Sequence, residues 1–150
     1  MLEPLTFTLA GEGDADAVFP LLATQLHEHD VAIGAAALRS ALVGLVTHPE
    51  RGAVLLAREG SRAVGIAVLA YTWTVEHGGK VAWLDELYVV PERRSSGLGT
   101  RLLREAMDHA RRHGCMAIDL EVDADHARVE ALYLRHGFAA LPRRRFACRL

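Results

Sequence analysis

A glycine-containing segment in the second half of the chain has the residue types needed to hold a phosphate group. It consists of Arg94, Ser95, Ser96, Gly97, Leu98, Gly99 and Thr100. The first N–H groups of a helix have no partner within the helix and lie at the positive end of its dipole. Glycine at a helix start lets a diphosphate approach these donors closely, while arginine and hydroxyl groups add further donors. The segment therefore predicts a diphosphate-binding turn.

Other glycine motifs fit this segment less well. A dinucleotide-binding fingerprint needs a third glycine where Leu102 stands, and a P-loop needs a Gly-Lys-Ser/Thr triplet that the chain does not contain. The remaining alternative is a tight strand-to-helix turn that binds nothing. A lone Gly97-Leu98-Gly99 would favour that alternative. The surrounding residues therefore decide between a diphosphate-binding turn and a turn that binds nothing.

Two adjacent carboxylates, Asp85 and Glu86, come shortly before the glycine segment. On a regular strand neighbouring side chains point to opposite faces, so only one of the two can face a bound substrate. A carboxylate there can accept a proton as a general base. The alternative is that both are ordinary surface carboxylates.

A histidine pair has the i, i+4 spacing that can bind a metal on a helix, namely His109 and His113. Both lie off the apolar stripe formed by Leu102, Ala106 and Ala110. We therefore expect them on a solvated face, and the sequence predicts no metal site.

The elements that must position these residues follow from apolar periodicity and turn residues. The predicted strands are 7–9, 54–57, 64–73, 81–90, 117–122 and 146–150, and the predicted helices are 14–29, 38–46, 97–113 and 127–136. Asp14 is a plausible N-cap, while Pro20 either kinks the first helix or follows its start. Strand–helix–strand units after the meander indicate an α/β (α+β) fold with a mixed sheet and helices on its faces.

Length and composition fit one globular domain over residues 1–150. Residues of the AVILMFWYC set make up 51% of the chain, charged residues make up 24%, and the net charge is −2. This charge argues against a nucleic-acid partner that needs a strong positive field. Cys115 and Cys148 form no CxxC pair, and 64–71, the longest apolar run, is too short to span a bilayer. We expect a cytoplasmic protein without a membrane partner.

The glycine segment resembles the acetyl-CoA loop of the GNAT superfamily of N-acetyltransferases. That loop has the pattern Arg/Gln-x-x-Gly-x-Gly/Ala after a strand ending Val-x-Pro, and here it stands at residues 94–99 after Val89-Val90-Pro91. A second family signature, a helix with Leu-Tyr that ends in Gly-Phe, stands at residues 132–138. The resemblance covers about residues 81–138. It implies a central, mostly antiparallel sheet of six to seven strands flanked by about four helices.

The resemblance also implies how acetyl-CoA, the cosubstrate, is held. In the family the pantetheine arm binds like an extra strand beside the strand that precedes the loop, and the Val89 N–H would polarise the thioester carbonyl. His126 stands where many relatives have an asparagine that binds this arm; it either substitutes as a donor or only begins the helix. The predicted cofactor-binding residues are Leu87, Tyr88, Val89, Arg94, Ser95, Ser96, Gly97, Leu98, Gly99, Thr100 and His126.

For the chemistry, the resemblance implies direct attack of a primary amine on the thioester. The segment is closest to the polyamine and diamine acetyltransferase branch, in which Asp85 falls at the base position. Aspartate replaces the usual glutamate there, which favours a water relay and leaves Glu86 as the second candidate. Tyr133 corresponds to the tyrosine that protonates the departing thiolate; the alternative is that it is simply a core residue of an amphipathic helix.

The acceptor is predicted only by class. Glu28, His29 and Asp30 form a polar cluster that would favour a cationic amine on a small molecule or peptide. Relatives are often dimers, so a homodimer is a further expectation. One alternative function is a regulatory domain with the same fold that binds CoA without catalysis, and another is a scaffold or antitoxin-like role without CoA.

Overall fold

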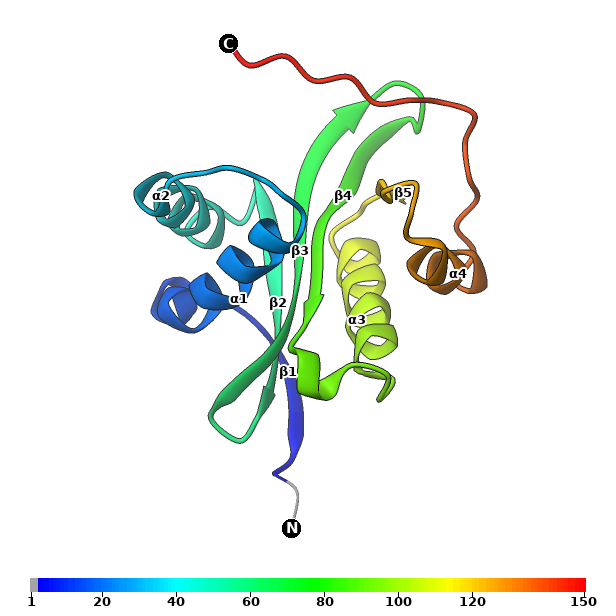
Figure 1. Cartoon of the computed structure of the whole chain (residues 1–150). Coiled ribbons are helices and arrows are strands. Elements are labelled where there is room, and N and C mark those ends of the chain that lie inside the picture. The colour runs from blue at the N-terminus through cyan, green and yellow to red at the C-terminus, as the bar shows by residue number, and fades with distance from the viewer. Residues whose placement is uncertain (1–2) are drawn as a thin grey trace. The chain divides into compact units, whose positions relative to one another are not determined.

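Five strands form one sheet in which spatial order follows chain order (Figure 1). The computed structural model describes residues 3–150. The strands are β1 (Leu5–Leu9), β2 (Gly52–Glu59), β3 (Arg62–Thr74), β4 (Gly79–Val89) and β5 (Ala117–Asp119). Strands β1 to β4 pair antiparallel, whereas β5 runs parallel to β4. A parallel pair needs a crossover connection, and a helix supplies it here.

Helices cover both faces of this sheet (Figure 1). Helices α1 (Ala15–Glu28) and α2 (Ala35–Val46) lie on one face, and α3 (Leu98–Arg112) lies on the other. Short 3₁₀ turns, Glu12–Asp14 and Pro91–Arg93, precede α1 and the loop into α3. The α+β class predicted from the sequence is confirmed, and the described residues form four α-helices, the last of which is α4 (Ala127–Arg135). None of the helices in the described part of the chain is long and apolar enough to cross a membrane.

The core under α1 and α2 is built from alternate residues of the central strands. Because strand side chains alternate between faces, one set packs on α1 and α2 and the other on α3. The strand residues in the first set are Val54, Leu56, Ile66, Val68 and Tyr88, all at most 5% exposed. From α1, Ala15, Val18 and Leu22 complete this layer. Tyr88 is therefore a core side chain.

Close packing of α3 on the sheet depends on Gly65 of β3. A Cβ added there would lie 2.7 Å from Cδ1 of Leu102 and 3.0 Å from the Tyr88 carbonyl oxygen. Leu102 is fully buried. The missing side chain lets the first turns of α3 approach the strand pair from which the site is built.

The start of α1 differs in detail from the expectation. Pro20 lies inside α1, five residues after its start at Ala15, so the helix continues through it. Asp14 precedes the helix without capping it through its side chain. Its carboxylate instead accepts the Gly11 N–H at 2.9 Å and binds Arg58 at 2.8 Å. Both interactions lower the pKa of Asp14, the Gly11 hydrogen bond most.

The residues after Leu120 form a second compact unit, Glu121–Leu150, with one helix, α4 (Ala127–Arg135). The predicted strand 146–150 is wrong: this segment has no regular structure and Phe146 is 85% exposed. Strand formation requires a pairing partner, which a short apolar segment alone does not provide. The predicted strand 117–122 ends at Asp119. Because 146–150 forms no strand, the sheet of the described residues has five strands rather than six to seven. A single domain over the whole chain stays a prediction.

Candidate active site

A β-bulge interrupts β4 at Asp85. Val68 of β3 pairs with Glu86, while the next residue, Leu69, pairs with Leu84, so Asp85 is the extra residue on β4. A bulge bends the strand and breaks the alternation of side chains. Asp85 is exposed, whereas Glu86 is partly buried. The expectation that the two carboxylates simply alternate between faces does not hold here.

Beyond the bulge, β4 has an open edge. Among the described residues, pairing with β5 is confined to Val81, Ala82 and Trp83. Val90 donates its N–H to Val64 at 3.0 Å, so by antiparallel alternation Tyr88 also bonds to β3 through its backbone. Leu87 and Val89 consequently turn their backbone groups toward the open edge. This edge can accept an additional extended ligand as a strand would be accepted.

The two carbonyl groups on this edge are contacted by side chains. Gln25 of α1 donates Nε2–H to the Leu87 oxygen at 3.4 Å. Arg94 donates Nε–H to the Val89 oxygen at 3.0 Å. The N–H groups of Leu87 and Val89 point to the same edge and are the donors available to a ligand.

Glu86 lies on the α1 and α2 face of the sheet, opposite the buried Val68. Burial raises the pKa of the Glu86 carboxyl group, and the neighbouring charge of Asp85 adds to this. A hydrogen bond from Gln25 and the proximity of His29 act in the opposite direction. A carboxylate with a raised pKa is better matched to accepting a proton near neutral pH than an exposed one.

The loop into α3 has the backbone that the glycine segment predicts. Gly97 is the N-cap of α3 with φ of 82°, and Ser95 has φ of 60°. A positive φ suits glycine, which has no Cβ to clash. The N–H groups of the first helical turn, from Leu98 to Thr100, have no partner within the helix. The Leu98 side chain is buried in the core, so only its backbone can face a ligand.

Three consecutive residues tie this loop to three different elements. Glu92 forms an ion pair with Arg62 at the start of β3, and Arg93 forms one with Glu59 at the end of β2. Arg94 donates to both carboxylate oxygens of Glu28, at the end of α1. These contacts hold the loop where β4 ends.

The predicted cationic partners are thus already paired. Arg94 also lies over the Tyr88 ring, 5.4 Å from its centroid. The Ser96 hydroxyl donates to the Arg93 carbonyl, which stabilises the turn. Ser95 is exposed and Thr100 is partly buried. In this arrangement, the backbone N–H groups at the start of α3 are the donors that remain for an anion.

The two predicted residues beyond Leu120 are described within their own unit. Tyr133 of α4 is 8% exposed and packs edge-to-face on Phe138, with ring centroids 5.5 Å apart. His126 is the N-cap of α4 and makes no capping bond through its side chain. It lies 3.9 Å from the carboxylate of Asp123 and 3.9 Å from that of Asp125.

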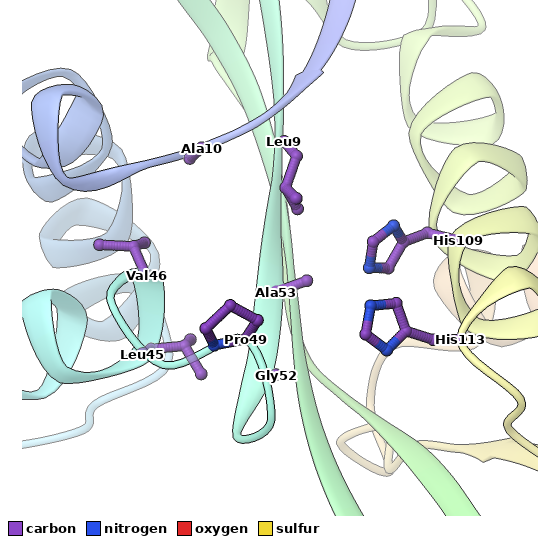
Figure 2. Close-up of a pocket in the computed structure, with 9 residues that line it drawn as sticks. All are labelled: Leu9, Ala10, Leu45, Val46, Pro49, Gly52, Ala53, His109 and His113. Atoms are coloured by element: carbon purple, nitrogen blue, oxygen red, sulfur yellow. The ribbon is translucent and has the colours of Figure 1, made fainter.

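The prediction that His109 and His113 lie on a solvated face of their helix is wrong for His109. His109 is 8% exposed, because α3 buries a broader face than an i, i+4 stripe. His109 and His113 both line a small pocket beside β2, and Figure 2 shows their rings side by side. Lys80 Nζ lies 3.2 Å from Nδ1 of His113, and an ammonium group there opposes a metal cation. No residue of the β4–α3 loop lines this pocket.

Sequence reasoning missed Gln25 as a residue of the site. It continues the buried stripe of α1, after Ala15, Val18 and Leu22, and is 7% exposed. A polar residue at a core position of an amphipathic helix is the signal that could have found it, because buried polar groups need partners. Its partners lie on β4, which only the fold reveals.

The comparisons with known proteins agree with this geometry. The family model described as the Acetyltransferase (GNAT) family matches residues 18–138, most of the chain. The chain therefore belongs to the GNAT acetyltransferase family.

Individual relatives fit the same assignment. YhfO of Bacillus subtilis, an uncharacterized N-acetyltransferase, is 29% identical over 85 residues, which are 57% of each chain. Aminoglycoside N(6′)-acetyltransferase type 1 of Klebsiella aerogenes is 31% identical over 99 residues, which are 65% of this chain and 64% of that protein. The matched part of this chain thus spans less than two thirds of the length of either relative. The crystal structure of a candidate acetyltransferase from Arthrobacter sp. FB24 is 31% identical, with a TM-score of 0.81 and coverage of 97% and 96%.

Proposed function

We propose that the chain is an acetyl-CoA-dependent N-acetyltransferase that acts on a primary amine of a small molecule or peptide. The observation that carries this proposal is the open edge of β4, which ends at the glycine loop and the N-terminus of α3. Backbone donors at Leu87 and Val89, followed along the chain by those of the first turn of α3, suit an extended ligand with a diphosphate at one end.

In this proposal the backbone of the chain does most of the binding. The N–H groups at the start of α3 bind the diphosphate of acetyl-CoA, and Leu87 bonds to the pantetheine arm. The Val89 N–H donates to the thioester oxygen, where negative charge develops as the amine attacks. Removing one such donor typically costs about 10²–10³-fold in rate.

Glu86 is our choice for the general base. An amine is mostly protonated at neutral pH, so a group in the site must take its proton before or during attack. Glu86 is partly buried beside Gln25 and His29, and burial raises its pKa, whereas Asp85 is exposed on the bulge. Asp85, the residue favoured by the family resemblance, would then contribute negative charge near an incoming cationic amine.

Tyr133 is proposed as the acid that protonates the departing thiolate. This assignment rests on its place in the Leu-Tyr…Gly-Phe signature of the family. A Tyr133→Phe variant should lose most of its turnover with acetyl-CoA affinity unchanged. An unchanged rate would remove the assignment.

The acceptor class is proposed to be a cationic amine, such as a polyamine, diamine or aminoglycoside. The acidic residues Asp85 and Glu86 beside the open edge support this, as does a relative named for aminoglycosides. The full chain should be incubated with acetyl-CoA and separate amines, including spermidine, a diamine, lysine, an aminoglycoside and a peptide. CoA release should occur with cationic primary amines and not with neutral or anionic acceptors.

Two outcomes of the CoA-release assay combined with a calorimetric binding measurement would contradict the proposal. Acetyl-CoA binding, measured by calorimetry, without turnover on any amine would favour a regulatory CoA-binding domain. The absence of binding at millimolar acetyl-CoA would argue against both functions.

A further inference from the structure

Gln25 is one of two polar side chains buried among residues 3–150, and it faces the reacting end of β4. It is 7% exposed and lies on the core-facing stripe of α1. Burying an amide in a core costs free energy unless both of its N–H donors find acceptors. A buried glutamine at such a position therefore needs a specific reason.

The Gln25 amide has two acceptors on β4. Its Nε2 donates to the Leu87 carbonyl at 3.4 Å, and the amide also lies close enough to the Glu86 carboxylate to lower the pKa of that group. A carbonyl and an ionised carboxylate can only accept, so the NH₂ group of the amide must face both. The planar amide thus joins two consecutive residues that follow the bulge at Asp85.

We propose that Gln25 is a positioning residue that fixes the Glu86 carboxylate and the Leu87 backbone beside the open edge of β4. This inference rests on the proposed function, in which Glu86 is the base and Leu87 binds the pantetheine arm. A bulged strand without a neighbour on one side is free to shift, and a hydrogen bond to each of two adjacent residues fixes it. Gln25 touches neither reacting atom and acts through Glu86.

The charge balance around Glu86 fits this role. Asp85 on β4 and burial both favour the neutral acid, while Gln25 and His29 on α1 favour the ionised base. Gln25 donates to the charged form, which lowers the pKa of Glu86. Without Gln25, the carboxyl group would retain its proton to a higher pH and would lose its fixed orientation.

The direct test is the titration of Glu86 by carbon NMR of the full chain labelled at glutamate carboxyl carbons, with Glu86→Gln as the assignment standard. Gln25→Met removes both donors at similar volume and should raise the titration midpoint of Glu86. Gln25→Glu keeps the size of the side chain and adds a negative charge beside Glu86, so it should also raise the titration midpoint of Glu86. This variant replaces Gln25→Met in the test if the methionine variant does not fold. Thr24→Ala, an exposed neighbour on α1, is the matched control and should leave the midpoint unchanged. An unmoved Glu86 midpoint in the folded Gln25 variants overturns the proposal.

Kinetics supply the second readout. In Gln25→Met, kcat/KM should be about tenfold lower near pH 6 and recover toward the unsubstituted protein at high pH, since a hydrogen bond to a charged group is lost. A loss of equal size at every pH would indicate a merely structural role and would contradict the proposal. If the unsubstituted protein acetylates no amine, the proposed function itself fails. If it is active but the Gln25 variants leave the titration midpoint of Glu86 unchanged, only the proposed role of Gln25 is refuted.

Discussion

Arg94 donates hydrogen bonds from its Nη2 to both carboxylate oxygens of Glu28, each at 3.2 Å. This pair joins the loop before α3 to the last turn of α1. It occupies the side chain that, by the family resemblance, would bind the diphosphate. If Arg94 binds it, acetyl-CoA and Glu28 compete for the same cation.

We predict that Glu28→Gln binds acetyl-CoA about 2- to 5-fold more tightly, because Arg94 no longer has to leave a charged partner. The range corresponds to the modest strength of partly exposed ion pairs. Calorimetric titration at physiological salt measures it. Asp108→Asn removes a carboxylate from another exposed ion pair, with Arg111, and should leave the affinity unchanged. Weaker binding by Glu28→Gln would show that the pair supports the loop instead.

Glu86→Gln should lower kcat/KM by about 10²–10⁴-fold at neutral pH, the usual contribution of a general base. Affinity for acetyl-CoA should stay the same, since the Glu86 side chain is not among the proposed acetyl-CoA contacts. Asp85→Asn is the matched control and should lose less. A larger loss in Asp85→Asn would indicate that Asp85, which the family resemblance favours, is the general base.

The pH profile carries a separate prediction. Burial raises the pKa of Glu86, so the base becomes protonated at a higher pH than an ordinary glutamate. Activity should therefore rise with pH through an acid limb displaced upward from the usual glutamate range. The limb should disappear in Glu86→Gln if this residue is the titrating base. A limb that persists in that variant would assign it to another group.

The sequence predicts the local features of this site and misses those that depend on strand register. The turn and the extent of α3 follow from a few adjacent residues, and the structure places both ends of the predicted helix 97–113 within one residue. The bulge at Asp85 depends on how β4 pairs with β3, which no short pattern encodes. Gln25 and Leu87 are 62 residues apart, so their hydrogen bond is a property of the fold.

Two errors have a related cause. The burial of His109 depends on how wide a face α3 presents to the sheet, and the stripe of Leu102, Ala106 and Ala110 understates it. The predicted strand at 146–150 is mostly apolar but lacks a strand partner in the described structure. In both cases the local residue pattern leaves open how the segment packs, which tertiary structure decides.

Gly97 and Gly99 should respond differently to alanine. Gly97 has φ of 82°, so Gly97→Ala should lower the free energy of unfolding by about 1–2 kcal/mol, the cost of a left-handed backbone for a residue with a Cβ. Gly99 lies inside α3, and a Cβ added there would lie 3.9 Å from Val89 Cγ2, an ordinary van der Waals distance. Gly99→Ala should therefore be neutral or raise the free energy of unfolding by up to about 1 kcal/mol. Urea unfolding measures both changes.

The same pair of variants tests the diphosphate site. A methyl group at Gly99 would stand among the N–H donors of the first turn, so Gly99→Ala should weaken acetyl-CoA binding although it does not weaken the fold. Calorimetry of the folded protein measures this loss. Full affinity in Gly99→Ala would mean that the diphosphate does not approach this turn closely.

His109 predicts a dependence of stability on pH that is separate from catalysis. Burial lowers the pKa of His109, with smaller contributions from the charges of His113, Arg112 and Lys80. The unfolded chain therefore binds a proton at His109 more readily than the folded chain does. Folding stability should fall as pH drops below the ordinary histidine value of 6.5.

The comparison is urea unfolding at pH 7.5 and pH 5.5 for the unsubstituted protein and for His109→Gln, which stays neutral at both. The loss of stability between the two pH values should be smaller in His109→Gln. His27→Gln, which replaces an exposed histidine on α1, is the matched control and should retain the full loss. Equal losses in all three proteins would mean that His109 can take up a proton without leaving its place between α3 and the sheet.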